Sequence, residues 1–221
     1  MDKEQFLSVK KSLPPHVKLV AVTKTHPTET VMEAYRLGHK IFGENKVQEL
    51  LAKQQVLPED IEWHLIGHLQ TNKVKYIIPF VSMIQSVDSL KLLKVINSEA
   101  SKTGRVINCL LEFHIAGEET KFGLDLDEAR KILESEDYKT MKNVKICGVM
   151  GMASFTPDRD QIRKEFRNLA EIFRTLRADY FVDSEWFREI SMGMSGDYDI
   201  AIEEGATIVR LGTILFGERM K

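Results

Sequence analysis

The chain has 221 residues, with 31 Lys and Arg against 33 Asp and Glu, so its formal net charge is only -2. This length allows a sizeable core, and the balanced charge gives no reason to expect a nucleic acid partner, although a local basic patch is compatible with it. The longest apolar runs are strand-sized, which excludes a membrane-spanning helix. The N-terminal residues mix both charges without an apolar signal core, and two cysteines cannot form a disulfide framework. We therefore expect a soluble cytoplasmic protein in which Cys109 and Cys147 are small buried hydrophobic residues.

Short runs rich in Val, Ile and Leu alternate along the chain with longer segments of helical spacing. We expect strands at residues 17–25, 40–44, 62–68, 80–87, 106–115, 144–153, 187–194 and 207–216. The apolar spacing between them predicts helices at residues 1–13, 28–38, 88–101, 160–177 and 198–204. Gly38 is expected to end the second of these helices, and Asp88 to cap the third.

This alternation predicts an α/β fold. Successive strands joined by helices pair in parallel through right-handed crossovers, and strands that are apolar throughout fit a sheet buried on both faces. An open doubly wound sheet and a closed barrel both satisfy the pattern, and the count of eight favours a (β/α)8 TIM barrel with an extra N-terminal helix at residues 1–13. The connections are short and no linker is visible, so we expect residues 1–221 to form a single domain.

Lys24 ends the first predicted strand, and period two places it on one face with Val20 and Val22. Active sites of (β/α)8 barrels form at the carboxyl ends of the strands. An amine held there between apolar neighbours is partly desolvated, which lowers a lysine pKa and frees the amine to attack a carbonyl as a Schiff-base nucleophile. Alternatively, Lys24 simply marks the end of the strand with its head in solvent.

A second group of polar residues follows the seventh and eighth predicted strands. Ser195 is a candidate N-cap for the next helix, and Gly193 and Gly196 allow backbone amides to approach a ligand closely. Gly212 and Thr213 follow the eighth strand, and barrels often bind phosphate between these two loops. The same residues also fit ordinary turns. A nucleophilic serine is a poorer interpretation, because the Gly-x-Ser-x-Gly spacing is lacking.

The other predicted strands end in further polar candidates. These are Asn45, His64 or His68, Gln85, His114 and Ser154. His64 and His68 are four residues apart, which suits a shared zinc ion on a helix but is too far on a strand. We therefore expect no metal site.

A reactive lysine together with a phosphate site suggests an aldehyde that carries a phosphate, and pyridoxal 5'-phosphate has both groups at opposite sides of one ring. Arg210, on the eighth predicted strand between them, is placed to face the ring nitrogen. A guanidinium does not give up its proton, so it keeps that nitrogen unprotonated and weakens the ring as an electron sink. This favours a held cofactor or limited proton chemistry.

Six motifs spread over nearly the whole chain point to a known family. They are AVTKTHP at residues 21–27, FGENKVQE at 42–49, WHLIGHLQTNK at 63–73, QSVD at 85–88, SMGMS at 191–195 and VRLGTILFG at 209–217. In this order they resemble the pyridoxal phosphate homeostasis proteins (the YggS/PROSC type). Two segments depart from the family pattern: Thr120 and Phe122 stand where serines are usual, and residues 148–153 differ from the usual end of the sixth strand.

The resemblance implies a barrel like the N-terminal domain of alanine racemase, with pyridoxal 5'-phosphate bound as a Schiff base on Lys24. It further implies that Ser195, Gly212 and Thr213 hold the phosphate, that Arg210 faces the ring nitrogen, and that Asn45 lies near the ring. Members of the family are regarded as carriers or regulators of the cofactor rather than enzymes. We therefore expect a non-catalytic monomer whose partners are the cofactor and the apoenzymes that use it.

A racemase-like enzyme is the main alternative. Racemisation needs two positioned acid/base groups, and in the racemases that this barrel resembles the second is a tyrosine of a separate C-terminal domain. The sequence ends at Lys221, soon after the eighth strand, so we expect no such domain. The five tyrosines fall in predicted helices or loops: Tyr35, Tyr76, Tyr138, Tyr180 and Tyr198.

Two further classes explain less of the sequence. A cofactor-free aldolase acting on a sugar phosphate would use Lys24 and the phosphate site but leaves Arg210 and the motifs unexplained. A pure interaction module leaves the polar residues at the strand ends without a role.

Overall fold

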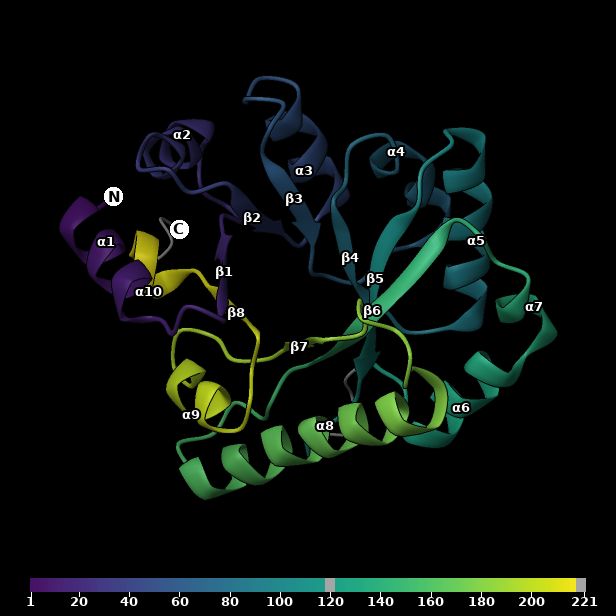
Figure 1. The fold of residues 1–221 in the computed structure, drawn as a ribbon. Coiled ribbons are helices and arrows are strands. Elements are labelled where there is room, and N and C mark those ends of the chain that lie inside the picture. The colour runs from purple at the N-terminus through teal and green to yellow at the C-terminus, as the bar shows by residue number, and fades with distance from the viewer. Residues whose placement is uncertain (118–121, 218–221) are drawn as a thin grey trace.

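A closed barrel of eight parallel strands forms the centre of the molecule, as the computed structural model shows for residues 1–117 and 122–217 (Figure 1). The strands are β1 (Lys18–Val22), β2 (Ile41–Glu44), β3 (Glu62–Leu65), β4 (Met83–Val87), β5 (Ile107–Phe113), β6 (Val144–Gly151), β7 (Glu189–Ser191) and β8 (Ile208–Leu211). Each pairs with its neighbour in the sequence, and β1 closes the barrel on β8. The predicted (β/α)8 fold is confirmed.

Helices surround the barrel and cover its outer face (Figure 1). They are α1 (Lys3–Ser12), α2 (Thr28–Arg36), α3 (Val47–Gln54), α4 (Val74–Ile77), α5 (Leu90–Lys102), α6 (Leu126–Glu134), α7 (Glu136–Lys139), α8 (Arg159–Tyr180), α9 (Tyr198–Glu203) and α10 (Thr213–Phe216), with a 3-10 turn η1 (Thr71–Lys73) before α4. The predicted extra helix before the first strand is α1. None of the described helices is long and apolar enough to cross a bilayer.

Acidic side chains begin several of these helices. The carboxylate of Asp158 accepts hydrogen bonds from the first turn of α8, and Asp125 forms a capping box with Glu128 at the start of α6. The prediction that Asp88 caps the third predicted helix is wrong, because Ser89 is the N-cap of α5 and its hydroxyl accepts from Leu92 N.

The carboxyl end of the chain differs from the prediction. Residues 213–216 belong to helix α10 and not to the eighth strand, although their apolar run is typical of a strand. The chain leaves the barrel after Leu211, and Phe216 then packs against Phe6 of α1, with the ring centroids 6.1 Å apart. A short apolar run fits either element, and here tertiary packing decides. Helices α1 and α10 lie side by side in Figure 1.

Two apolar layers fill the molecule. The larger lies between the strands and the helices, and the smaller lies inside the barrel, where Val20, Met83, Leu110, Cys147, Met150 and Ile208 meet. Cys109 belongs to the outer layer and Cys147 to the inner one, and both are buried free thiols. Burial raises the pKa of the Cys147 thiol to about 11, so it behaves as an apolar group. The inner layer supports the carboxyl ends of the strands, where the polar candidates gather.

Candidate functional site

A cavity of about 340 Å³ opens at the carboxyl ends of β1, β7 and β8. All six of the residues that the sequence predicted for a cofactor line it: Lys24, Asn45, Ser195, Arg210, Gly212 and Thr213. The remaining lining residues are Val22, Ile66, Met152, Phe155, Met194, Gly196 and Asp197. The cavity therefore combines an apolar wall with an amine, a guanidinium and hydroxyl groups.

Lys24 lies two residues beyond the end of β1 and is half-buried. The predicted alternation holds, because Val20 faces the inside of the barrel while Val22 and Lys24 line the cavity above it. The next residue, Thr25, has a positive φ of 67°, which is uncommon for a β-branched residue. Its backbone N–H donates to Glu49 Oε2 at 2.8 Å, and this bond stabilises the turn that points the chain away after Lys24.

A buried ion pair lies directly behind this turn. Lys53 Nζ of α3 is 2.5 Å from Glu44 Oε1 and donates to the backbone carbonyl of Thr23 at 2.7 Å. The Thr23 hydroxyl donates to the same Glu44 oxygen at 2.6 Å. Burial raises the pKa of the Glu44 carboxyl, while the Lys53 ammonium and the Thr23 hydroxyl act in the opposite direction. The pair thus joins the residue before Lys24 to the residue before Asn45.

The sequence analysis missed this pair. Lys53 looks like an ordinary charged position of an amphipathic helix, four residues after Glu49. The one available signal was Glu44, a carboxylate inside an apolar strand, which needs a buried cation.

Asn45 presents an unsatisfied group at the cavity. Its Oδ1 atom is buried and makes no hydrogen bond within the part of the chain that the structure describes. Gly67 lies so close to it that an added Cβ would be 2.5 Å from the Asn45 carbonyl oxygen. Glycine is therefore required at position 67 to let the two loops meet. A buried acceptor of this kind is expected to receive a hydrogen bond from a ligand.

The opposite side of the cavity is built from backbone groups. Ser195 Oγ accepts hydrogen bonds from Gly212 N and Ile214 N, each at a long 3.3 Å. Gly193 has φ of 92°, and a Cβ there would lie 2.6 Å from the Cβ of Ala201. The loop after β7 therefore needs glycine for both its conformation and its packing. The prediction that Ser195 caps the next helix is wrong, because Asp197 is the N-cap residue of α9 and Ser195 is turned toward the amides after β8.

Asp197 is a site residue that the sequence analysis did not single out. Its carboxylate accepts a hydrogen bond from Met194 N at 2.5 Å and closes the loop after β7. Burial raises the pKa of this carboxyl, with the Met194 N–H opposing the shift. The Ser-Gly-Asp sequence is typical of a tight turn and could have indicated this.

Arg210 forms the floor of the cavity and is only 4% exposed. Its two terminal nitrogens donate to Ser191 Oγ at 2.7 Å and to the Gly151 carbonyl at 3.1 Å. Burial lowers its pKa to about 10, against the opposing charges of Glu112 and Asp197, so it remains charged at neutral pH. Glu112 is also buried, and burial followed by repulsion from Asp88 raises its pKa to about 7.

The other strand-end candidates lie outside the cavity lining. His64 and Gln85 are buried inside the barrel and bonded to each other, and His68 Nδ1 contacts Asp88 at 3.2 Å. His114 lines a separate small cavity with Phe122, and Ser154 donates to Glu165 of α8 at 2.8 Å. Phe122, one of the two atypical residues, stacks on His68 with ring centroids 4.4 Å apart, whereas Thr120 lies outside the described residues.

A larger cavity, of about 430 Å³, lies at the opposite end of the barrel, between α1 and the first residues of β1 to β3. Its two lysines are occupied with the protein itself, since Lys10 donates to the Gly38 carbonyl and Lys40 pairs with Asp60. No convergent set of polar groups comparable with that at the carboxyl ends is seen there among the described residues. We therefore place the functional site at the carboxyl ends of the strands.

Comparison with known proteins first defines the class. The family model of the alanine racemase N-terminal domain matches residues 3–220. An alanine racemase of Clostridium difficile has the same fold, with a TM-score of 0.77 and 12% identity over 99% of this chain and 57% of its own.

Closer relatives narrow the assignment. The pyridoxal phosphate homeostasis protein of Aquifex aeolicus is 43% identical, covering 91% of this chain and 87% of its own, and the human protein of that name is 38% identical, covering 91% and 76%. The chain belongs to the pyridoxal phosphate homeostasis protein family, as the motifs predicted. The solved structure of PipY from Synechococcus elongatus with pyridoxal phosphate bound has a TM-score of 0.88 and 35% identity, covering 97% of this chain and 99% of its own.

Proposed function

We propose that this chain binds pyridoxal 5'-phosphate covalently through Lys24 and serves in its homeostasis by holding and delivering it, without efficient catalysis. The observation that carries the proposal is one cavity that brings together Lys24 from the loop after β1, Ser195 from the loop after β7 and Arg210 from β8. Its volume of about 340 Å³ lies within the range of small-molecule sites, roughly 300–1,000 Å³.

The residues of the cavity fit this cofactor. When bound, pyridoxal phosphate supplies a phosphate, a pyridine ring and an aldehyde, and the aldehyde can condense with an amine. The amides of Gly212 and Ile214, held at 3.3 Å by Ser195 Oγ, can turn to phosphate oxygens, which are stronger acceptors than a hydroxyl. The unsatisfied Asn45 Oδ1 and the apolar Val22 and Met194 provide a polar and an apolar contact for the ring.

Each residue then has one task. Lys24 would provide the amine that bonds to the aldehyde carbon, with the aldehyde oxygen leaving as water. Ser195, Gly212 and Thr213 bind the phosphate and orient the ring between them and Lys24. Arg210 donates from the floor of the cavity, and because a guanidinium keeps its proton, the ring nitrogen can only accept. This arrangement limits the withdrawal of electrons into the ring and supports holding over carbanion chemistry.

The tyrosines also support a carrier. A racemase on this barrel needs a second acid/base group beside the lysine. Each tyrosine lies in a helix, in α2, α4, α7, α8 and α9, and none is among the described residues that line the cavity. The likeness to alanine racemase at 12% identity concerns the fold alone.

The test is the visible absorption spectrum of the purified protein with added pyridoxal phosphate, before and after borohydride, followed by peptide mass mapping. We expect a band that borohydride abolishes and a label fixed on Lys24. Lys46→Ala, which removes an exposed lysine near the site, is the matched control and should label as the wild type does. A label scattered over surface lysines would refute the covalent site, and rapid turnover of amino acids would refute the carrier.

The proposal extends to the setting in which the protein works. We place it in the cytoplasm, which the two free buried cysteines support, as a monomer that passes the cofactor to apoenzymes. To test delivery, an apoenzyme is mixed either with the loaded protein or with the same concentration of free cofactor. Faster recovery of the apoenzyme's activity with the loaded protein would support delivery. Equal rates would contradict it, and analytical ultracentrifugation tests the monomer.

A further inference from the structure

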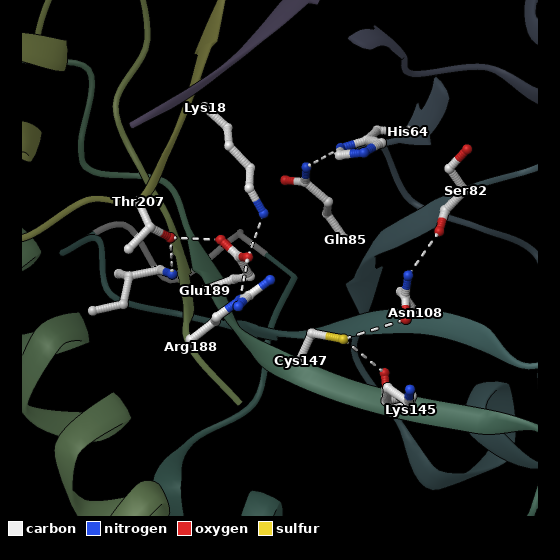
Figure 2. Close-up of polar contacts among 11 residues, drawn as sticks. Lys18, His64, Ser82, Gln85, Asn108, Lys145, Cys147, Arg188, Glu189 and Thr207 are labelled. Atoms are coloured by element: carbon white, nitrogen blue, oxygen red, sulfur yellow. Dashed lines mark hydrogen bonds and ion pairs between the residues drawn. The ribbon is translucent and has the colours of Figure 1, made fainter. Parts of the chain in front are cut away.

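A continuous chain of buried hydrogen bonds runs from Arg210 across the inside of the barrel. Arg210 Nη1 donates to Ser191 Oγ at 2.7 Å, Ser191 Oγ donates to Gln85 Oε1 at 2.6 Å, and Gln85 Nε2 lies 2.9 Å from His64 Nδ1. The chain starts on β8 and β7 and ends on β4 and β3, which lie across the barrel. Figure 2 shows its far end, where the Gln85 amide points at the His64 ring.

The direction of the donors along this chain is fixed by its ends. Arg210 can only donate, so Ser191 Oγ must accept from it and has its single proton left for Gln85. The Gln85 oxygen receives that proton, and its amide nitrogen then faces His64 Nδ1 as a donor. With the amide turned over, Ser191 Oγ would accept from two donors, and its own proton would lose its acceptor in this chain. The orientation with Gln85 Oε1 toward Ser191 is therefore the one that gives the Ser191 proton an acceptor.

His64 completes the chain as a neutral acceptor. It is 5% exposed, and burial, reinforced by the charge of Lys18, lowers its pKa to about 3. The ring is therefore neutral at neutral pH, with a proton on one nitrogen only, and with Gln85 Nε2 as the donor the unprotonated nitrogen is Nδ1. Lys18 itself pairs with Glu189 at 2.5 Å, and Glu189 also accepts from Thr207 at 2.8 Å (Figure 2). Lys18 and Glu189 thus compensate each other's charge and take no part in the hydrogen-bond chain.

We propose that Gln85, acting through Ser191 and anchored by His64, is the positioning residue that fixes the Arg210 guanidinium at the floor of the cavity. The consequence of this inference for the cofactor rests on the proposed function, in which the guanidinium is the hydrogen-bond donor to the pyridine nitrogen. Arg210 makes two of the hydrogen bonds described here, to Ser191 and to the Gly151 carbonyl. Without the chain only the bond to Gly151 would remain, and the guanidinium could rotate about it. Buried networks in which every group is satisfied are the ones that hold a single geometry.

The design of the experiment separates this inference from the proposed function. Gln85→Leu removes both hydrogen bonds at similar volume, and Ser191→Ala removes only a hydroxyl and so tests the chain if the first variant folds poorly. Met83→Leu is the matched control, because Met83 lies beside His64 in the β3–β4 register and packs inside the barrel without belonging to the chain. All four proteins, wild type included, are compared in the apo state and with pyridoxal phosphate.

In the apo protein, the readout is hydrogen exchange and rotation of the Arg210 guanidinium by ¹⁵N NMR. We expect slow exchange in the wild type and in Met83→Leu, and exchange about tenfold faster or more in Gln85→Leu and Ser191→Ala, as loss of one buried hydrogen bond implies. Equally slow exchange in all four proteins would overturn the inference, whether or not the cofactor binds.

With the cofactor, the readouts are the absorption maximum, its dependence on pH and the rate of release. We expect both chain variants to shift the band and its titration and to release pyridoxal phosphate about tenfold faster, while borohydride still labels Lys24. An unchanged spectrum in both chain variants would overturn the role toward the ring. If the wild type bound no cofactor, the proposed function would fail, and the NMR result would still decide whether Gln85 positions Arg210.

Discussion

The two sides of the cavity place their chemical groups by different means. On the lysine side, the buried pair Lys53 and Glu44 bonds to Thr23 and so sets the backbone just before Lys24. On the side that we propose for the phosphate, called the phosphate side below, backbone amides converge on Ser195 Oγ, and Gly193 gives the loop a conformation that other residues rarely adopt. The first side depends on charge, and the second depends on the absence of a side chain.

This difference determines how each side can fail. A charged pair is disrupted by removing one partner, because the other is left buried without compensation. A glycine loop tolerates changes of charge nearby but not an added Cβ, because the chain cannot move away from its neighbours. The loss of stability caused by substitutions of the buried pair on the lysine side should therefore depend on pH. The loss caused by substitutions of glycine on the phosphate side should depend on the size of the new side chain.

The largest effect is expected at Lys24, the residue of the lysine side that we propose bonds to the cofactor. Lys24→Ala removes the amine, so we expect complete loss of borohydride-fixed label at this position. The phosphate side is left intact, and weak non-covalent binding should remain, measurable by equilibrium dialysis. Equal affinity of the wild type and Lys24→Ala for pyridoxal phosphate would show that the lysine side contributes nothing to binding.

Lys53→Met tests the charge on the lysine side. It leaves the Glu44 carboxylate buried without its cation, and breaking a buried pair in this way costs about 3–5 kcal/mol. Since the pKa of Glu44 is already raised by burial, loss of the ammonium raises it further above the unfolded value. The deficit is therefore fully present above the folded pKa and disappears as the pH falls below the unfolded pKa.

Urea unfolding across this pH range provides the measurement for Lys53→Met. The control is Lys94→Met, which breaks an exposed pair with Asp137 and should cost about 0–1 kcal/mol. A deficit for Lys53→Met that does not change with pH would contradict the role of the buried charge. The variant should also slow the reaction of Lys24 with pyridoxal, which lacks the phosphate and so reports on the lysine side alone.

Gly193→Ala tests the backbone on the phosphate side. The added Cβ would lie 2.6 Å from Ala201 Cβ at a φ of 92°, and overpacking with an unfavourable backbone costs about 2–3 kcal/mol. Gly196→Ala is the matched control in the same loop, because a Cβ there has no neighbour within 4 Å among the described residues. We expect lower stability for Gly193→Ala only, by thermal unfolding, and weaker inorganic phosphate binding for Gly193→Ala than for the wild type, by calorimetry. Equal effects at both positions would refute the steric argument.

The barrel and the residues of the cavity were within reach of the sequence. Strand-sized apolar runs alternating with helical spacing predicted the fold, and the rule that sites lie at the carboxyl ends of barrel strands singled out Lys24 and the loops after β7 and β8. The same rule gave Asn45 as a strand-end candidate and the motifs gave it a place near the ring, but its unsatisfied oxygen was not visible in the sequence. Periodicity worked here because every strand is buried on both faces.

The supporting contacts were out of reach for a physical reason. Lys53 reaches Glu44 from a helix, and Gln85 reaches Ser191 across the barrel, so neither pair is marked by a spacing in the sequence. Helix α10 was mistaken for strand because its apolar run fits both elements until Phe216 meets Phe6. Side-chain pairs that depend on tertiary packing were missed, while features set by local pattern were found.

The smallest expected effect, at Ser195, sharpens the comparison of the two sides. Ser195→Ala removes the hydroxyl that holds the Gly212 and Ile214 amides but leaves those amides in the backbone, where they can still bind a phosphate. We therefore expect affinity for pyridoxal phosphate to fall by only about 1–2 kcal/mol, the value of one charge-assisted hydrogen bond. The affinity for pyridoxal, measured in parallel by the same titration, should not change, because the lysine side is untouched. A loss as large as that of Lys24→Ala would mean that the side chain, rather than the backbone, holds the phosphate.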